Sequence, residues 1–144
     1  MSIIEYANTV IWEVGLKMKL LDIIKALSHK NRLRIINAVR QKELCVCELQ
    51  NVLDVNQSNA SRHLNKLKKA GIIKSEHKAQ WVYYSLNQKL LNEHIFIREL
   101  IDKELDNQDL FKEDNQRLNY YQESGLTCQN LRNKEIDLNN YNCK

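Results

Sequence analysis

The sequence has no proline and only three glycines among its 144 residues. Because these two residues punctuate turns and interrupt helices and strands, their scarcity argues against a turn-rich β fold and favours helices. A hydrophobic fraction of 43% is sufficient for a folded core. The length is that of one ordinary domain with a short appendage.

Long apolar runs are also missing. No stretch approaches the roughly 18 apolar residues of a membrane span, and the N-terminus lacks the basic segment and apolar run of a signal peptide. We therefore expect a cytoplasmic protein with no membrane contact. In that compartment the four cysteines are expected to be thiols or metal ligands rather than disulfides.

The usual sequence features of an enzyme are absent as well. There is no glycine-rich phosphate loop, no nucleophile with a partner base and no pair of carboxylates in apolar surroundings. We predict that the chain is not an enzyme and that it needs no organic cofactor.

The net charge is only +4, but the positive residues are concentrated. Between residues 57 and 80, six lysines and arginines accompany a single acidic residue, whereas between 111 and 144 five positive and five negative residues cancel. A short basic stretch is typical of a surface that contacts phosphates, although a solvated helix face has the same composition.

Apolar spacing predicts a mostly α fold with a small β-hairpin. Helical spacing runs through residues 3–27, and Ser28 is a suitable N-cap for the next helix. Further helices are expected over about 47–53, 57–70 and 88–110, with strands at 72–75 and 81–86. We divide the chain into a domain at 1–110 and a polar, flexible C-terminal tail at 111–144, with a weak helix at about 114–121.

Two short helices joined by a tight turn and followed by a hairpin have the order of a winged helix-turn-helix. The second helix buries Ala60, Leu64 and Leu67 and presents side chains that pair with base edges and phosphates. We predict that this protein binds double-stranded operator DNA. The predicted contacts are Gln57, Ser58, Asn59, Ser61, Arg62, His63, Asn65 and Lys66, with Lys78 at the hairpin tip.

Several blocks of the sequence resemble the ArsR/SmtB family of metal-responsive repressors. They are Ala26 to Ile36, the specific run Glu43-Leu44-Cys45-Val46-Cys47-Glu48-Leu49, Gln57 to Leu67, Ala70 to Ile73 and Trp81 to Leu86. The resemblance covers about residues 20–101. It implies a homodimer whose α-helical interface uses the first and last helices of the core. It also implies that the dimer without inducer holds an operator and that an inducer releases it.

Cys45 and Cys47 are two residues apart, so on a regular helix their side chains point to nearly opposite faces. Joint ligation of one ion therefore requires extended or unwound backbone, and it would reshape the helix before the DNA-reading helix. Thiolates favour soft, thiophilic ions, and a helix N-terminus lowers a thiol pKa. Free cysteines also serve simply as small buried apolar residues.

In the arsenic-responsive members of the family that the sequence resembles, a third cysteine three residues after the second completes the site. Here that position is Gln50, so any third thiolate has to come from elsewhere. No cysteine precedes residue 45, unlike in cadmium-responsive relatives, and Asn92, His94, Leu105 and Gln108 do not form the last-helix site of zinc-responsive relatives. We predict As(III) or Sb(III) bound by Cys45, Cys47 and a tail cysteine, with Cys128 favoured over Cys143. A site with only two thiolates, suited to a methylated arsenical or to As(III) retaining a hydroxide, stays open.

Two other functions fit the same sequence. One is a redox-sensing or reactive-sulfur-sensing repressor on the same fold, in which Cys45 or Cys47 is oxidised or joined to a tail cysteine. The other is a metal-independent winged helix that binds a partner protein, against which the specific cysteine run counts.

Overall fold

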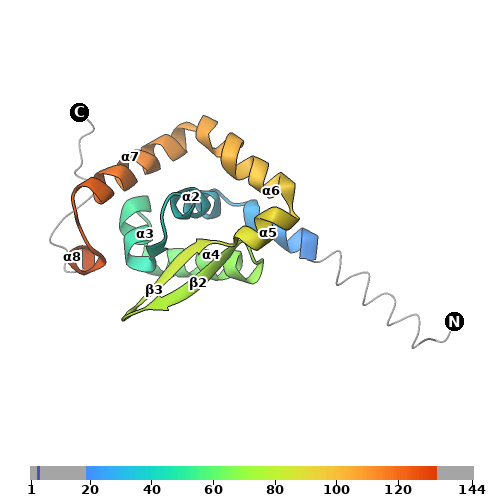
Figure 1. The fold of residues 1–144 in the computed structure, drawn as a ribbon, viewed down its shortest axis with the longest axis horizontal. Coiled ribbons are helices and arrows are strands. Elements are labelled where there is room, and N and C mark those ends of the chain that lie inside the picture. The colour runs from blue at the N-terminus through green and yellow to red at the C-terminus, as the bar shows by residue number, and fades with distance from the viewer. Residues whose placement is uncertain (1–2, 4–18, 133–144) are drawn as a thin grey trace.

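The computed structural model describes residue 3 and residues 19–132 (Figure 1). After a helix at 19–27 come α2 (Lys30–Val39), β1 (Leu44–Cys45), α3 (Val46–Leu53), α4 (Gln57–Lys69), β2 (Ile73–Lys78) and β3 (Trp81–Leu86). The chain continues through α5 (Gln88–Glu93), α6 (Ile95–Glu99), the π-helical η1 (Leu100–Glu104), the 3-10 turn η2 (Leu105–Asn107), α7 (Asp109–Glu123) and α8 (Cys128–Arg132). Most of the helix predicted before residue 19, and Cys143, lie outside the described residues.

The helix-turn-helix consists of α3 and α4, as predicted. The turn begins at Asp54, whose φ of 52° is left-handed, and the Asn56 side chain caps α4 by accepting a hydrogen bond from the Asn59 backbone N–H at 2.8 Å. Gly71 ends the segment with φ +80°, a conformation that disfavours any side chain. The inner face of α4 is fully buried, so its predicted apolar stripe is confirmed; the stripe is Ala60, Leu64 and Leu67.

The sheet has three antiparallel strands in the order β1-β3-β2, one more than the predicted hairpin. β2 and β3 pair from Ile73 with Leu86 to Lys78 with Trp81, which leaves a two-residue turn. Within that turn Ala79 has a φ of 55°. The additional strand β1 pairs Cys45 with Tyr83. Because of this pairing, the backbone that leads into α3 is extended at Cys45.

The C-terminal third differs from the prediction in two ways. The expected continuous helix at 88–110 breaks at His94, whose φ of −126° and ψ of 83° are not helical. The expected flexible tail from residue 111 instead begins with the 15-residue α7, which the predicted boundary at 110/111 cuts. Phe111, Leu118 and Tyr121 are buried, so α7 is part of the packed structure.

Helix α7 crosses over α2 and α3, and α8 lies beside α3 (Figure 1). The core is therefore shared by the winged helix and these two C-terminal helices, which contribute Phe111, Leu118, Tyr121 and Leu131 to it. Over residues 19–132, no helix combines the length and the apolar character that crossing a bilayer requires.

Candidate functional site

Cys45 lies at the point where β1 ends and α3 begins. It is the N-cap of α3 with φ −86° and ψ 169°, and its backbone N–H donates to Glu48 Oε1 at 3.0 Å. The backbone is thus extended at Cys45 and helical at Cys47, the second residue of α3. This is the geometry that joint use of two cysteines at i and i+2 requires, because the opposed directions of a regular helix do not apply here.

Cys128, the first residue of α8, lies directly against Cys45. The two Sγ atoms are 2.8 Å apart, and both side chains are buried. A local motif fixes the start of α8: the Thr127 backbone N–H donates to Asn130 Oδ1 at 2.9 Å. The buried Leu131 anchors the same short helix in the core. Residues 83 positions apart are thereby brought together as a thiol pair.

Cys47 is half-buried beside this pair. Its thiol donates to the backbone carbonyl oxygen of Cys128 at 3.6 Å, and Asn51 Nδ2 donates to its Sγ at 3.8 Å. Among residues 19–132, no three or more Cys, His, Asp or Glu side chains already surround one point as metal ligands do. The three thiols are therefore adjacent, but the Cys47 side chain has to turn before all three share one ion.

Burial governs the protonation of the two inner thiols. Burial raises the pKa of Cys45 to about 11, and burial together with the neighbouring Cys45 and Cys47 thiols raises the pKa of Cys128 far above its usual value. The lowering of the thiol pKa expected at the N-terminus of α3 is not found at Cys45, where desolvation outweighs the hydrogen bonds with the Cys128 thiol and the Glu48 backbone that lower the pKa. Both groups are neutral thiols near pH 7.

A cavity of about 350 Å³ adjoins Cys45 and Cys47 and reaches the first turn of α4. Its walls include Cys45 from the end of β1, Cys47 from α3, Gln57 from the first turn of α4, and Trp81 from β3. A change in the first turn of α3 therefore occurs beside the N-terminus of α4. We call Cys45, Cys47 and Cys128 the thiol site.

Most of the predicted DNA contacts lie at the surface. Exposed members of the set are Gln57, Ser58, Arg62, Asn65, Lys66 and Lys78, while Asn59 and Ser61 are half-buried. Lys78, the last residue of β2, forms an ion pair with Glu43. The Asn59 side-chain oxygen accepts a hydrogen bond from Asn31 Nδ2 at 3.4 Å.

The inclusion of His63 among the DNA contacts was wrong, because its side chain is 2% exposed. Its ring lies 4.3 Å from the His29 ring, and its Nδ1 is 3.3 Å from Arg32 Nη1. Burial, helped by positive charges nearby, lowers the pKa of His63 to about 4, so the ring is neutral. The spacing contained a signal for this, since position 63 is three residues after Ala60 and four before Leu67 on the inner face of α4.

Sequence reasoning missed two buried polar contacts of α7. Tyr121 Oη donates to Glu48 Oε2, and Asp114 pairs with Arg34 at 2.8 Å. Phe111, Leu118 and Tyr121 have helical spacing, which was the one available signal for a packed helix.

The family model described as "Bacterial regulatory protein, arsR family" matches residues 29–75, which excludes α7 and α8. The cadmium resistance transcriptional regulatory protein CadC homolog of Staphylococcus aureus is 36% identical over 87 residues, covering 60% of this chain and 67% of that protein. The arsenic resistance transcriptional regulator ArsR1 of Pseudomonas putida is 42% identical over 69 residues, covering 47% and 54%. Several curated relatives are matched over only 54–61% of their own length.

Among solved structures, reduced HlyU from Vibrio cholerae superposes with a TM-score of 0.51 at 27% identity, covering 63% of this chain and 96% of that one. The winged-helix prediction is confirmed by the described fold and by its likeness to a solved winged helix-turn-helix domain from Mycobacterium bovis, which superposes with a TM-score of 0.55 at 21% identity, covering 67% of this chain and 91% of that one. The relatives are regulators, which agrees with the prediction that the chain is not an enzyme. The arsR family model matches this chain, and the match to the 36%-identical Staphylococcus aureus regulator covers two thirds of that protein. The chain therefore belongs to the arsR family of bacterial regulatory proteins.

Proposed function

We propose that this protein is a homodimeric transcriptional repressor that binds operator DNA in the cytoplasm and is released by trivalent arsenic or antimony captured at the thiol site. The observation that carries the proposal is the 2.8 Å contact between Cys45 and Cys128 at the start of α3, the helix that precedes α4. Relatives described as arsenic resistance and cadmium resistance regulators support a thiophilic inducer.

Charge balance favours arsenic over cadmium. In the exchange As(OH)₃ + 3 R–SH → As(S–R)₃ + 3 H₂O, three As–O and three S–H bonds break, three As–S bonds and three O–H bonds form, and the product is neutral. Cd²⁺ with the same three thiols releases three protons and leaves one net negative charge. That charge would lie among buried groups, Cys45 and Cys128, and next to the buried Glu48 carboxylate, where low dielectric and repulsion disfavour it.

Ligation acts on the first turn of α3. To join Cys45 and Cys128 on one ion, the Cys47 thiol leaves the Cys128 carbonyl oxygen and the Asn51 amide. Gln57, the first residue of α4, lines the same cavity as Cys47, so this rearrangement changes the surroundings of the N-terminus of the reading helix. Since base contacts depend on placement within the groove, a small shift of α4 is sufficient to weaken binding.

The dimer uses apolar surface that one chain leaves uncovered. Leu20, Leu21 and Ile24 on the helix at 19–27 are 45–48% exposed, and Ile95 and Phe96 on α6 are 70% and 44% exposed. Exposed apolar residues gathered on two elements are typical of an interface. They lie on the first described helix and on the segment after the wing, where the predicted interface is located.

The test is DNA release. A fluorescent duplex selected by the purified full chain from a random pool is bound to the protein, and As(III), Sb(III) and Cd(II) are added in separate titrations of fluorescence anisotropy. We expect As(III) and Sb(III) to release the wild type, and Cys45→Ser, Cys47→Ser and Cys128→Ser to abolish or strongly weaken release. Cys143→Ser is the matched control and should respond like the wild type. DNA binding that is indifferent to As(III) and Sb(III) would contradict the proposal.

The same thiol contact favours a second candidate, a redox-sensing repressor. Two thiols this close form a disulfide with one peroxide, according to 2 R–SH + H₂O₂ → R–S–S–R + 2 H₂O. Release by peroxide without arsenic, together with loss of two hydrogens from the intact mass and recovery on reduction, would favour this candidate. Release by As(III) under reducing conditions that peroxide does not reproduce would exclude it.

A further inference from the structure

Helix α7 is attached to both ends of α3. At the N-terminal end, Tyr121 Oη donates to Glu48, whose other carboxylate oxygen accepts from the Cys45 backbone N–H. At the C-terminal end, Asp114 holds Arg34, and Arg34 Nη2 donates to the Leu53 carbonyl oxygen at 2.6 Å. Helix α7 is thus linked to Cys45 through Glu48 and to the last residue of α3, Leu53, through Arg34.

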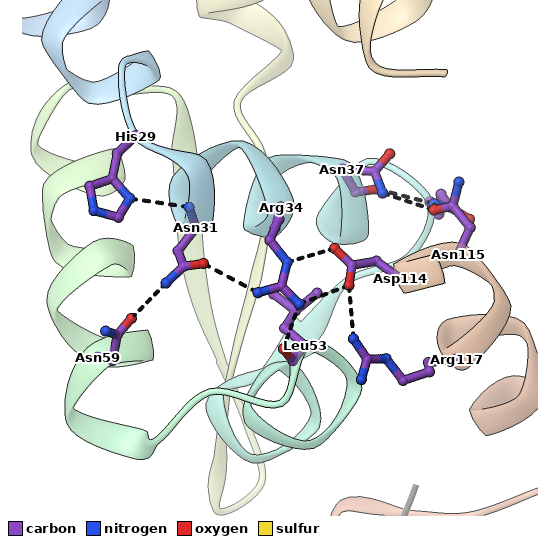
Figure 2. Close-up of polar contacts among 10 residues, drawn as sticks. His29, Asn31, Arg34, Asn37, Leu53, Asn59, Asp114, Asn115 and Arg117 are labelled. Carbon is purple, nitrogen blue, oxygen red and sulfur yellow. Dashed lines mark hydrogen bonds and ion pairs between the residues drawn. The ribbon is translucent and has the colours of Figure 1, made fainter. Parts of the chain in front are cut away.

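The second contact continues into the DNA-reading helix (Figure 2). Arg34 Nη1 donates to Asn31 Oδ1 at 3.2 Å, and Asn31 Nδ2 donates to Asn59 Oδ1 at 3.4 Å. Asn59 is in the first turn of α4, where its backbone N–H also donates to the capping Asn56 Oδ1 at 2.8 Å. An unbroken set of hydrogen bonds therefore leads from Asp114 to the N-terminus of α4.

The Asp114–Arg34 contact is well suited to transmit displacement. It is a two-pronged ion pair, with Arg34 Nε and Nη2 donating to the two carboxylate oxygens at 2.8 and 2.9 Å. The side chains are only 10% and 1% exposed, and Arg117 donates to the same carboxylate at 3.2 Å. Buried bidentate pairs are strong and geometrically specific, so Arg34 is expected to follow Asp114.

We infer that α7 relays the occupancy of the thiol site to α4, with Asp114 as the positioning residue of the relay. The inference rests on the proposed function. Capture of an ion at Cys45 and Cys128 moves the first turn of α3 and the start of α8, the two neighbours of the Tyr121 end of α7. Asp114 lies seven residues earlier, about 10 Å along the same rigid helix. Movement of Asp114 displaces the Arg34 side chain that is paired with it. This displacement passes to Asn31 and changes its hydrogen bond to Asn59.

The relay is tested by a coupling ratio, the DNA dissociation constant of the As(III)-saturated protein divided by that of the arsenic-free protein. The full-length wild type is compared with Asp114→Asn, which preserves the side-chain shape and removes the charge. Glu113→Gln, an exposed change of the same kind on the same helix, is the matched control. Asn31→Ala is a milder second variant that interrupts the path between Arg34 and Asn59 without uncovering a buried charge.

We expect wild type and Glu113→Gln to have the same coupling ratio. Asp114→Asn and Asn31→Ala should lower it by about tenfold, within the range of typical allosteric couplings, while As(III) still binds. A purely structural contribution of Asp114 would lower thermal stability but leave the ratio unchanged. An unchanged ratio in Asn31→Ala and in folded Asp114→Asn would overturn the relay alone. Failure of As(III) to release the wild type would overturn the proposed function and the relay with it.

Discussion

Leu118→Ala measures how firmly α7 is packed on the winged helix. Leu118 is fully buried at 0% exposure in the middle of α7. Truncation of a buried leucine to alanine costs about 2–5 kcal/mol, from lost apolar transfer energy and the cavity left behind. We take about 3 kcal/mol as the expected loss in the free energy of unfolding. With a urea m-value of about 2 kcal/mol per molar, the unfolding midpoint falls by about 1.5 M.

The assay is urea unfolding followed by far-UV circular dichroism at one fixed protein concentration, because dimerisation makes stability depend on concentration. Asn119→Ala, on the exposed face of the same helix, is the control and should shift the midpoint by less than about 0.5 M. If Leu118→Ala also left the midpoint within that limit, residues 109–123 would not be packed as described. The packing of α7 would then not explain why Cys128 lies against Cys45.

Three further predictions concern the surfaces and the histidine. Arg62→Ala, on the exposed face of α4, should weaken DNA binding about tenfold or more, measured by anisotropy; an unchanged affinity would remove Arg62 from the interface. Lys66→Ala should reduce the slope of log affinity against log salt concentration by about one, as loss of a phosphate contact does; an unaltered slope would exclude that contact. The pKa of His63 is about 4 in the folded chain and 6.5 as the ordinary value, so the unfolded chain binds more protons between these pH values. Stability contributed by neutral His63 is therefore complete above pH 6.5 and declines by up to roughly 3 kcal/mol toward pH 4. Urea midpoints across that range should fall less steeply in His63→Gln, and equal slopes would refute the assignment.

The winged helix was predictable because its signals are local. The inner face of α4 repeats at helical spacing, and Asn56 and Gly71 mark the two ends of the segment. β1 was missed because two residues carry no periodicity, and its strand pairing with Tyr83 is a tertiary contact. The break at His94 was missed because no proline or glycine marks it in the sequence.

A weak helix at about 114–121 was expected, but the packing of α7 into the core was missed because one of its inner positions is charged. The buried face is Phe111, Asp114, Leu118 and Tyr121, which has helical spacing, but a buried aspartate reads as polar until its partner is known. That partner, Arg34, lies 80 residues earlier in the chain. The site depends on the same packing. Cys45 and Cys47 were recognisable from their local run, whereas the proximity of Cys128 follows from the course of α7 and α8, which no local pattern specifies.

The most direct test of the three-thiol site is arsenic K-edge X-ray absorption of the As(III)-bound full chain, wild type beside Cys128→Ser and Cys143→Ser. We expect three sulfur neighbours around arsenic in the wild type and in Cys143→Ser. In Cys128→Ser we expect two sulfur neighbours and one oxygen. Three sulfurs retained in Cys128→Ser, or only two in the wild type, would contradict the assignment of Cys128 to the inducer site.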